Sequence, residues 1–169
     1  MADTVYLLLG SNLGNRERHM QVALDKLQSL EGLEVIATSP VYLSDAVGMP
    51  DGSPSFLNQV VKCEYLYPPH ELLHSVEKIE AAMGRTDKGT YQSRIIDIDI
   101  LLFGDRVLQL DDLTVPHPSL LERPFALIPL LAIDPELVDP RTGTPLESYV
   151  DSRDRERVLL YKDHVARNV

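Results

Sequence analysis

Strand-like and helical patterns alternate over residues 4–103, and their order constrains the fold more than any other feature of the sequence. Short apolar runs bounded by turn residues predict strands, whereas apolar residues spaced three and four apart predict helices. The predicted strands are 4–9, 34–39 continuing past Pro40 into 41–43, 56–65 and 94–103, and the predicted helices are 16–30 and 68–83.

The order strand, helix, strand, strand, helix, strand is the split βαβ arrangement of ferredoxin-like domains. The sequence therefore predicts an α+β fold with a βαββαβ core, in which helices cover one face of an antiparallel sheet. Beyond Gly104, helical turns are expected near 119–122 and 125–131, and the last 20 residues are expected to form a peripheral element. Because 169 residues suit one domain, residues 1–169 are expected to form a single domain with this C-terminal helical and loop extension.

The charge of the chain narrows the partners that it can bind. Its 26 acidic and 16 basic residues give a formal net charge of -10 at pH 7, which disfavours nucleic acids and anionic membranes as partners. No apolar run approaches the roughly 18 residues needed to cross a bilayer, and residues 1–4 do not resemble a signal peptide. The single cysteine, Cys63, excludes an internal disulfide and a cysteine-based zinc site. We therefore expect a cytoplasmic protein. The negative charge of any anionic ligand would be offset by local arginines or by a cation bound to carboxylates.

The segment Arg94–Phe103 carries the clearest sign of chemistry. Strand periodicity predicts that one face carries apolar residues for the core, namely Ile96, Ile98, Ile100 and Leu102. Asp97 and Asp99 then share the opposite face, with Cα atoms roughly 7 Å apart. Since aspartate disfavours strands and the two carboxylates repel each other, a divalent cation between them explains the pair, and oxygen ligands favour Mg²⁺. A solvent-facing strand edge is the alternative.

Basic residues flank this aspartate pair. Arg85 ends the preceding helix, Lys88 follows it, and Arg94 opens the strand, so the three cations have the charge to bind a polyphosphate. Ordinary surface salt bridges are the alternative. Glu80 falls inside the apolar stripe of helix 68–83, so its carboxylate needs a partner such as an arginine or a substrate hydroxyl. A helix-edge glutamate that reaches solvent is equally compatible with the pattern.

Two other motifs in the sequence are typical of different binding sites. The segment from His70 to His74 matches H-E-x-x-H, the zinc-hydrolase signature, but helical angles place both histidines opposite the apolar stripe. The segment Gly10–Gly14 joins a strand to a helix without the spacing of a phosphate-binding loop, so it is expected to position the chain. A zinc hydrolase and a non-catalytic ferredoxin-like ligand-binding domain therefore remain alternatives to a phosphate-transfer enzyme.

Six segments together resemble the 6-hydroxymethyl-7,8-dihydropterin pyrophosphokinase family of folate biosynthesis. They are Gly10–Gly14, Phe56–Asn58, Ile79–Glu80 with Gly84–Arg85, Arg94–Gly104, Leu113–Pro118 and Arg123–Phe125. They run in order and extend over about 5–140, most of the chain. The resemblance implies a ferredoxin-like fold and the transfer of the terminal diphosphate of ATP to the hydroxymethyl oxygen of the pterin, with release of AMP.

The resemblance also implies roles for individual residues. Asp97 and Asp99 would hold two Mg²⁺ ions, and Arg85 and Arg94 would clamp phosphates during catalysis. The residues implied for ATP binding are Glu80, Lys88, Ile100, Thr114, His117 and Arg123. The residues implied for pterin binding are Ser44, Val47, Phe56, Asn58 and Phe125, with the two phenylalanines stacking on the ring. The expected partners are these two small-molecule substrates, with no nucleic acid and no membrane, and the expected state is a monomer.

Overall fold

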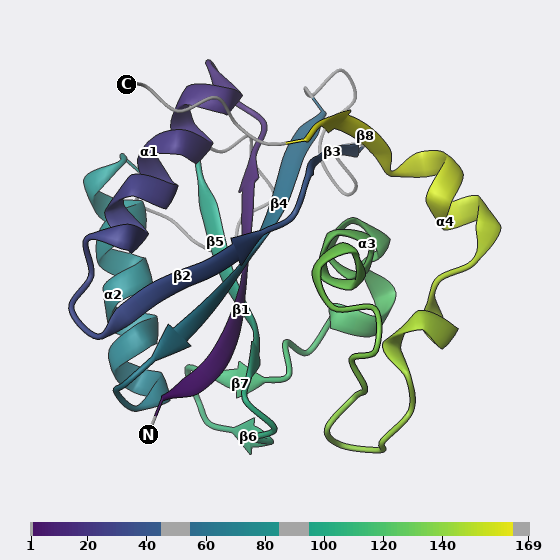
Figure 1. The fold of residues 1–169 in the computed structure, drawn as a ribbon. Helices are drawn as coiled ribbons and strands as arrows, with labels where there is room; N and C mark the ends of the chain where they lie inside the picture. Colours follow the sequence, from purple (N-terminus) through teal and green to yellow (C-terminus); the bar gives the residue numbers. More distant parts are fainter. Residues whose placement is uncertain (1, 45–54, 85–94, 164–169) are drawn as a thin grey trace.

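An antiparallel sheet with helices packed on both faces forms the centre of the protein (Figure 1), which is represented by a computed structural model describing residues 2–44, 55–84 and 95–163. The strands in chain order are β1 (Asp3–Ser11), β2 (Leu33–Thr38), β3 (Val41–Ser44), β4 (Phe56–Tyr65), β5 (Asp97–Phe103), β6 (Leu108–Gln109), β7 (Thr114–Val115) and β8 (Leu159–Lys162). The α-helices are α1 (Arg16–Gln28), α2 (Pro69–Ala82), α3 (Pro124–Ile133) and α4 (Ser152–Arg157), and short 3-10 helices span Leu120–Glu122 and Leu146–Tyr149.

The main sheet has the order β5-β1-β4-β3-β8, with β2 paired to the other half of β4. The pairs β1–β4, β1–β5, β2–β4 and β3–β4 are all antiparallel, which confirms the predicted ferredoxin-like core. The strand that was predicted to continue past Pro40 is instead divided there into β2 and β3. Ser39 bridges the break, because its N–H donates to Val60 O and its Oγ accepts the Val60 N–H. The short strands β6 and β7 form a separate two-stranded ribbon.

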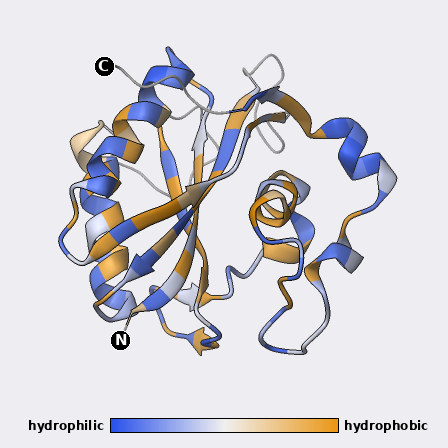
Figure 2. Cartoon of the chain, viewed as in Figure 1, coloured by the Kyte–Doolittle hydropathy of each residue, from blue (hydrophilic) through white to orange (hydrophobic). Residues whose placement is uncertain are grey.

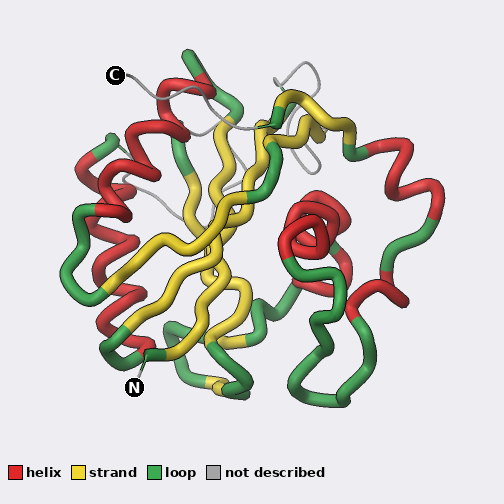
Figure 3. Tube along the Cα trace, in the orientation of Figure 1, coloured by secondary structure: helices red, strands yellow, loops and turns green. Residues whose placement is uncertain are grey.

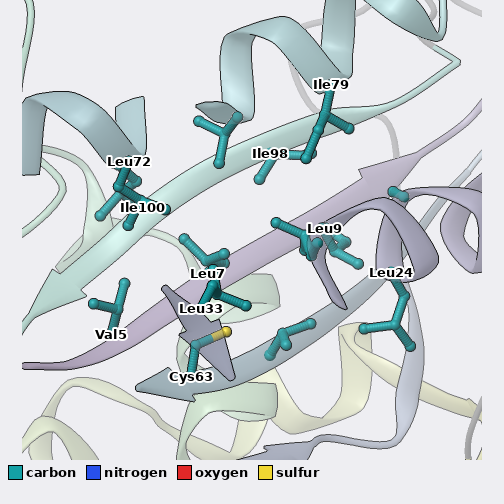
Figure 4. Packing of buried hydrophobic residues seen from close by; sticks show 14 of the residues in the cluster. Val5, Leu7, Leu9, Leu24, Leu33, Cys63, Leu72, Ile79, Ile98 and Ile100 are labelled. Carbon is teal, nitrogen blue, oxygen red and sulfur yellow. The ribbon is translucent and has the colours of Figure 1, made fainter. Parts of the chain in front are cut away.

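The larger core cluster fills the space between the sheet and helices α1 and α2. Figure 4 shows Leu72 and Ile79 of α2 facing Ile98 and Ile100 of β5, with Leu7 and Leu9 of β1 nearby. These apolar side chains hold β5 in place, so the residues between them on the strand are presented to the opposite face.

A second cluster lies on the other face of the sheet, where α3 packs (Figure 3). Six of the ten residues of α3 are buried, namely Ala126, Leu127, Ile128, Pro129, Leu130 and Leu131. The C-terminal extension therefore supplies a cover for the second face, which strand order alone did not predict. By contrast, α4 is hydrophilic (Figure 2) and buries none of its residues.

One prediction about β5 is wrong. The pairing of β1 with β5 shifts register, since Tyr6 opposes Leu102 while the next residue, Leu7, opposes Ile100. Leu101 is the extra residue of this bulge, and both Leu101 and Leu102 lie in the cluster under α3. Leu102 therefore does not share the face of Ile96, Ile98 and Ile100, because a bulge reverses the alternation beyond it.

The chain termini also depart from the predicted element bounds. β1 continues through Gly10 to Ser11 rather than ending at Leu9. The predicted peripheral element includes residues 159–162, which join the main sheet at one edge as the short strand β8. Glu17 of α1 accepts hydrogen bonds from Tyr161 Oη and Lys162 Nζ, each at 2.7 Å, which ties β8 to the helix layer. Within the described ranges, no helix is both long enough and apolar enough to span a bilayer.

Candidate active site

Asp97 and Asp99 lie on the face of β5 that is turned away from α1 and α2. Asp99 opposes Leu8 of β1, whose side chain belongs to the cluster under α3, and Asp97 opposes Gly10. Both aspartates are half-buried, in contrast to the fully buried Ile96 and Ile98. The predicted placement of two carboxylates together on one strand face is therefore confirmed.

Arg123 brings a positive charge to this pair. Its Nη1 lies 3.4 Å from Asp99 Oδ2, and the Asp99 side chain is only 13% exposed. Arg123 directly precedes α3, and its guanidinium carbon lies 5.7 Å from the centre of the Phe125 ring. The N-terminal end of α3 thus places a predicted ATP-binding cation next to Asp99 and a predicted pterin-binding ring next to that cation.

Glu80 has a partner that the sequence analysis did not consider. This residue of α2 is buried, and its Oε2 accepts a hydrogen bond of 2.9 Å from the backbone N–H of Ile98. Ile98 stands between the two aspartates on β5, which lies at one edge of the sheet. The carboxylate therefore satisfies an amide of an edge strand and holds the segment that carries Asp97 and Asp99.

Ser11 holds the residues just before β5. Its Oγ donates a hydrogen bond to the carbonyl oxygen of Ile95. The sequence pattern predicts only a turn at Ser11, and a short serine side chain gives no signal of this bond. The Gly10–Gly14 segment therefore positions β5 as well as connecting β1 to α1.

Three predicted pterin-binding residues lie together at the adjoining end of the sheet. Asn58 Nδ2 donates a hydrogen bond of 2.7 Å to Ser44 Oγ, and Phe56 opposes Ser44 across the β3–β4 pair. Asn58 also opposes Gly10 of β1, which in turn opposes Asp97 of β5. Because opposed residues in antiparallel strands project to the same face, the Asn58 amide and the Asp97 carboxylate flank Gly10 on one surface.

Of the remaining predicted site residues, three belong to the described part of the chain and four lie outside it. Thr114 is half-buried in β7, and the His117 N–H donates to Leu101 O at 2.9 Å, which anchors this segment to β5. The Ser119 N–H donates to His117 Nδ1 at 3.1 Å, so Nε2 is the nitrogen that carries the proton in the neutral ring. Ile100 instead packs its side chain into the core under α2. Arg85, Lys88, Arg94 and Val47 lie outside the described residues.

The H-E-x-x-H segment lacks the geometry of a zinc site. His70 and His74 are both exposed on α2, as predicted, and His70 Nε2 lies 2.9 Å from Asp112 Oδ1. This hydrogen bond lowers the pKa of the Asp112 carboxyl. Among the residues that the structure describes, no three histidine, cysteine or acidic side chains are grouped to hold a metal ion. A protein zinc site uses three or four such ligands, so zinc chemistry has no support here.

The aspartate pair fits a different kind of metal. Two carboxylates on one face offer oxygen ligands only, and Mg²⁺ is commonly held by one or two carboxylates with substrate phosphates and water completing its shell. Asp97 and Asp99 are therefore the residues that could hold Mg²⁺ when a nucleotide is bound.

Comparison with known proteins identifies the family of the chain. Residues 6–135 match the 7,8-dihydro-6-hydroxymethylpterin-pyrophosphokinase (HPPK) family. The 2-amino-4-hydroxy-6-hydroxymethyldihydropteridine pyrophosphokinase of Aquifex aeolicus is 42% identical over 146 residues, which are 86% of this chain and 89% of that protein. The chain therefore belongs to the HPPK family.

Some longer relatives match this chain over only part of their own length. The folic acid synthesis protein fol1 of Schizosaccharomyces pombe is 41% identical over 156 residues, which cover 92% of this chain and 21% of that protein. The fol1 protein of Pneumocystis carinii is 40% identical, with 95% of this chain and 22% of that protein covered. The crystal structure of an HPPK-DHPS in complex with substrates has the same fold, with a TM-score of 0.74 at 16% identity over 98% of this chain and 48% of that chain. This chain thus spans about a fifth of the two fungal relatives and about half of the HPPK-DHPS chain.

Proposed function

We propose that the protein transfers the terminal diphosphate of ATP to 6-hydroxymethyl-7,8-dihydropterin. The hydroxymethyl oxygen forms a bond to the β-phosphorus, while the bond from that phosphorus to the oxygen bridging it to the α-phosphorus breaks. AMP leaves with the bridging oxygen, and the hydroxyl proton is released. The observation that supports this proposal is the row Asp97, Gly10 and Asn58, which sets a carboxylate that could hold Mg²⁺ beside an amide that could bind the pterin.

The described residues divide between the two substrates. Asn58 and Ser44 would hydrogen-bond the edge of the pterin, and Phe56 and Phe125 would stack on its faces. Arg123 lies next to Asp99 and would offset the negative charge of a phosphate bound there. The Nε2–H of His117 would donate a hydrogen bond to a phosphate oxygen. Holding the two reactants in one geometry converts a bimolecular encounter into a step within the complex.

Mg²⁺ belongs to this proposal as the ion that Asp97 and Asp99 hold. When bound, it would offset the charge of the triphosphate and of the attacking oxygen, and two ions are expected. By family resemblance, Arg85 and Arg94 would clamp phosphates, while Lys88, Thr114, Ile100 and Glu80 would belong to the ATP site and Val47 to the pterin site. Glu80 acts on the described residues through Ile98, so it would also position the aspartates.

A product assay tests the proposal. The protein is incubated with ATP, Mg²⁺ and the reduced pterin, and nucleotides are separated by chromatography. AMP formation that depends on the pterin supports diphosphate transfer. ADP would indicate an ordinary kinase, and no turnover would favour a ligand-binding domain.

Two variants separate this reaction from the zinc alternative. Asp97→Ala removes a proposed metal ligand and is expected to abolish nearly all AMP formation. His74→Ala alters an exposed residue of α2 and is expected to leave activity within about twofold of the parent. Loss of activity in His74→Ala together with an active Asp97→Ala would contradict the assignment.

The proposal also covers the cellular location, the oligomeric state and the partners of the protein. We infer a cytoplasmic monomer that acts as a single domain on two small molecules, without a nucleic acid or a membrane. The net charge of -10 and the single buried cysteine support this setting. Size-exclusion chromatography with light scattering tests the monomer.

A further inference from the structure

Gly10 occupies a position where the protein itself has no need for glycine. The glycines of the described segments with positive φ are Gly14, Gly32, Gly84, Gly104 and Gly143, and Gly10 does not belong to that group. A Cβ atom built on Gly10 would lie 3.6 Å from Asn58 Oδ1 and 3.6 Å from Phe56 Cδ1, which are ordinary van der Waals contacts. Both the backbone and the packing would therefore accept an alanine.

Glycine nevertheless carries a cost at this position. Gly10 lies within β1 and is paired on both sides, with Asn58 of β4 and Asp97 of β5. Glycine weakens a strand because it loses the most backbone freedom on folding and offers no side chain for packing. A glycine inside a strand often marks a place where a ligand approaches the backbone closely.

The surroundings of Gly10 indicate which ligand this would be. The missing side chain would project between Asn58 and Phe56, two residues assigned above to the pterin. On its other side, β1 is paired with β5, one strand spacing of about 4.8 Å away, where Asp97 projects to the same face. Gly10 is thus a backbone position without a side chain, and it lies between the residues proposed to bind the ring and the carboxylate proposed to hold the metal.

We propose that Gly10 is a specificity-determining residue, whose lack of a side chain provides the clearance that lets a planar pterin ring reach Asn58 and Phe56 with its hydroxymethyl group toward Asp97. This inference rests on the proposed function and adds to it a steric requirement at one backbone position. A methyl group on Gly10 would occupy space needed by the ring, although it meets no clash in the protein alone. The nucleotide, assigned above to Asp99 and Arg123, does not need this clearance, because neither residue is opposed to Gly10.

The experiment compares the parent chain of 169 residues with Gly10→Ala and Gly10→Val. Isothermal titration calorimetry measures the binding of 6-hydroxymethyl-7,8-dihydropterin in the presence of Mg²⁺ and a non-hydrolysable ATP analogue, and the binding of Mg²⁺ with the analogue alone. Thr4→Val is the matched control, because Thr4 lies on β1 at the end away from Gly10 and opposes Glu64. Thermal unfolding of each variant reports whether the sheet is intact.

Gly10→Ala is expected to weaken pterin binding by about tenfold or more, and Gly10→Val by a larger factor. The Kd of the ATP analogue is expected to stay within about twofold of the parent, and the Tm of Gly10→Ala is expected to equal or exceed that of the parent. Thr4→Val should bind both ligands as the parent does.

Two results would overturn the assignment of Gly10. One is a pterin affinity in Gly10→Ala equal to that of the parent, and the other is an equal loss of affinity for both ligands together with a lower Tm, which indicates a distorted sheet. Either result leaves the proposed function standing as long as the parent binds the pterin. A parent that binds no pterin would instead overturn the proposed function, and with it the role of Gly10.

Discussion

Removal of the Glu80 carboxylate is expected to destabilise the strand that carries the aspartates. In Glu80→Ala the backbone N–H of the fully buried Ile98 loses the hydrogen bond that it donates to the Glu80 carboxylate. A hydrogen bond to a charged group contributes about 1.5–3 kcal/mol to stability. The buried carboxylate also carries a desolvation cost in the parent, which offsets part of that loss. The expected destabilisation is therefore about 2 kcal/mol.

This free-energy change converts to a measurable thermal shift. For a chain of this size, each 1 kcal/mol lowers Tm by about 2–4 °C, so Glu80→Ala should melt about 4–8 °C below the parent. AMP formation should fall as well, because Asp97 and Asp99 flank Ile98 and lose their fixed positions. Glu80→Gln keeps an oxygen that can accept the Ile98 N–H, so its Tm should lie between those of the parent and Glu80→Ala.

Glu77→Ala is the matched control, since Glu77 lies on the same helix and is exposed. Its Tm should stay near that of the parent, because surface substitutions usually change stability by less than about 0.5 kcal/mol. Differential scanning calorimetry and the AMP assay supply the two measurements. The reasoning is refuted if Glu80→Ala and Glu77→Ala melt together and turn over equally fast.

Three further predictions concern other parts of the molecule. Hydrogen bonds from Arg141 lower the pKa of the Asp139 carboxyl below its unfolded value, so its contribution to stability is present above about pH 4 and is lost as the pH falls through the lower, folded-state pKa. Denaturant unfolding should therefore show a smaller loss of stability below pH 4 in Asp139→Asn than in the parent, and parallel curves would contradict this. Burial raises the pKa of the Cys63 thiol to about 12, so a thiol reagent at pH 8 should label Cys63 only after unfolding; rapid labelling of the folded protein would be the contrary result. Asn58→Ala removes the donor to Ser44 and should weaken pterin binding by more than it weakens ATP binding, whereas equal losses would argue against the assigned roles.

The sequence by itself determined the core of the fold and the position of the aspartate pair. Strand and helix periods are local properties of the chain, so the order of the first six elements follows from them and the structure confirms it. The same alternation predicted that Asp97 and Asp99 share a face, since residues two apart on a strand project to the same side. The helical period likewise placed Glu80 in the apolar stripe and both histidines at the surface.

Only the tertiary structure decided which other groups lie next to Asp97 and Asp99. The bulge at Leu101, the docking of α3 on the second face and the pairing of β8 with β3 all depend on contacts between segments far apart in the chain. Such contacts leave no periodic signal, because they are set by register and by the packing of one element on another. For the same reason, the bond from Glu80 to Ile98 and the row that joins Asp97, Gly10 and Asn58 appear only once three strands and a helix are assembled.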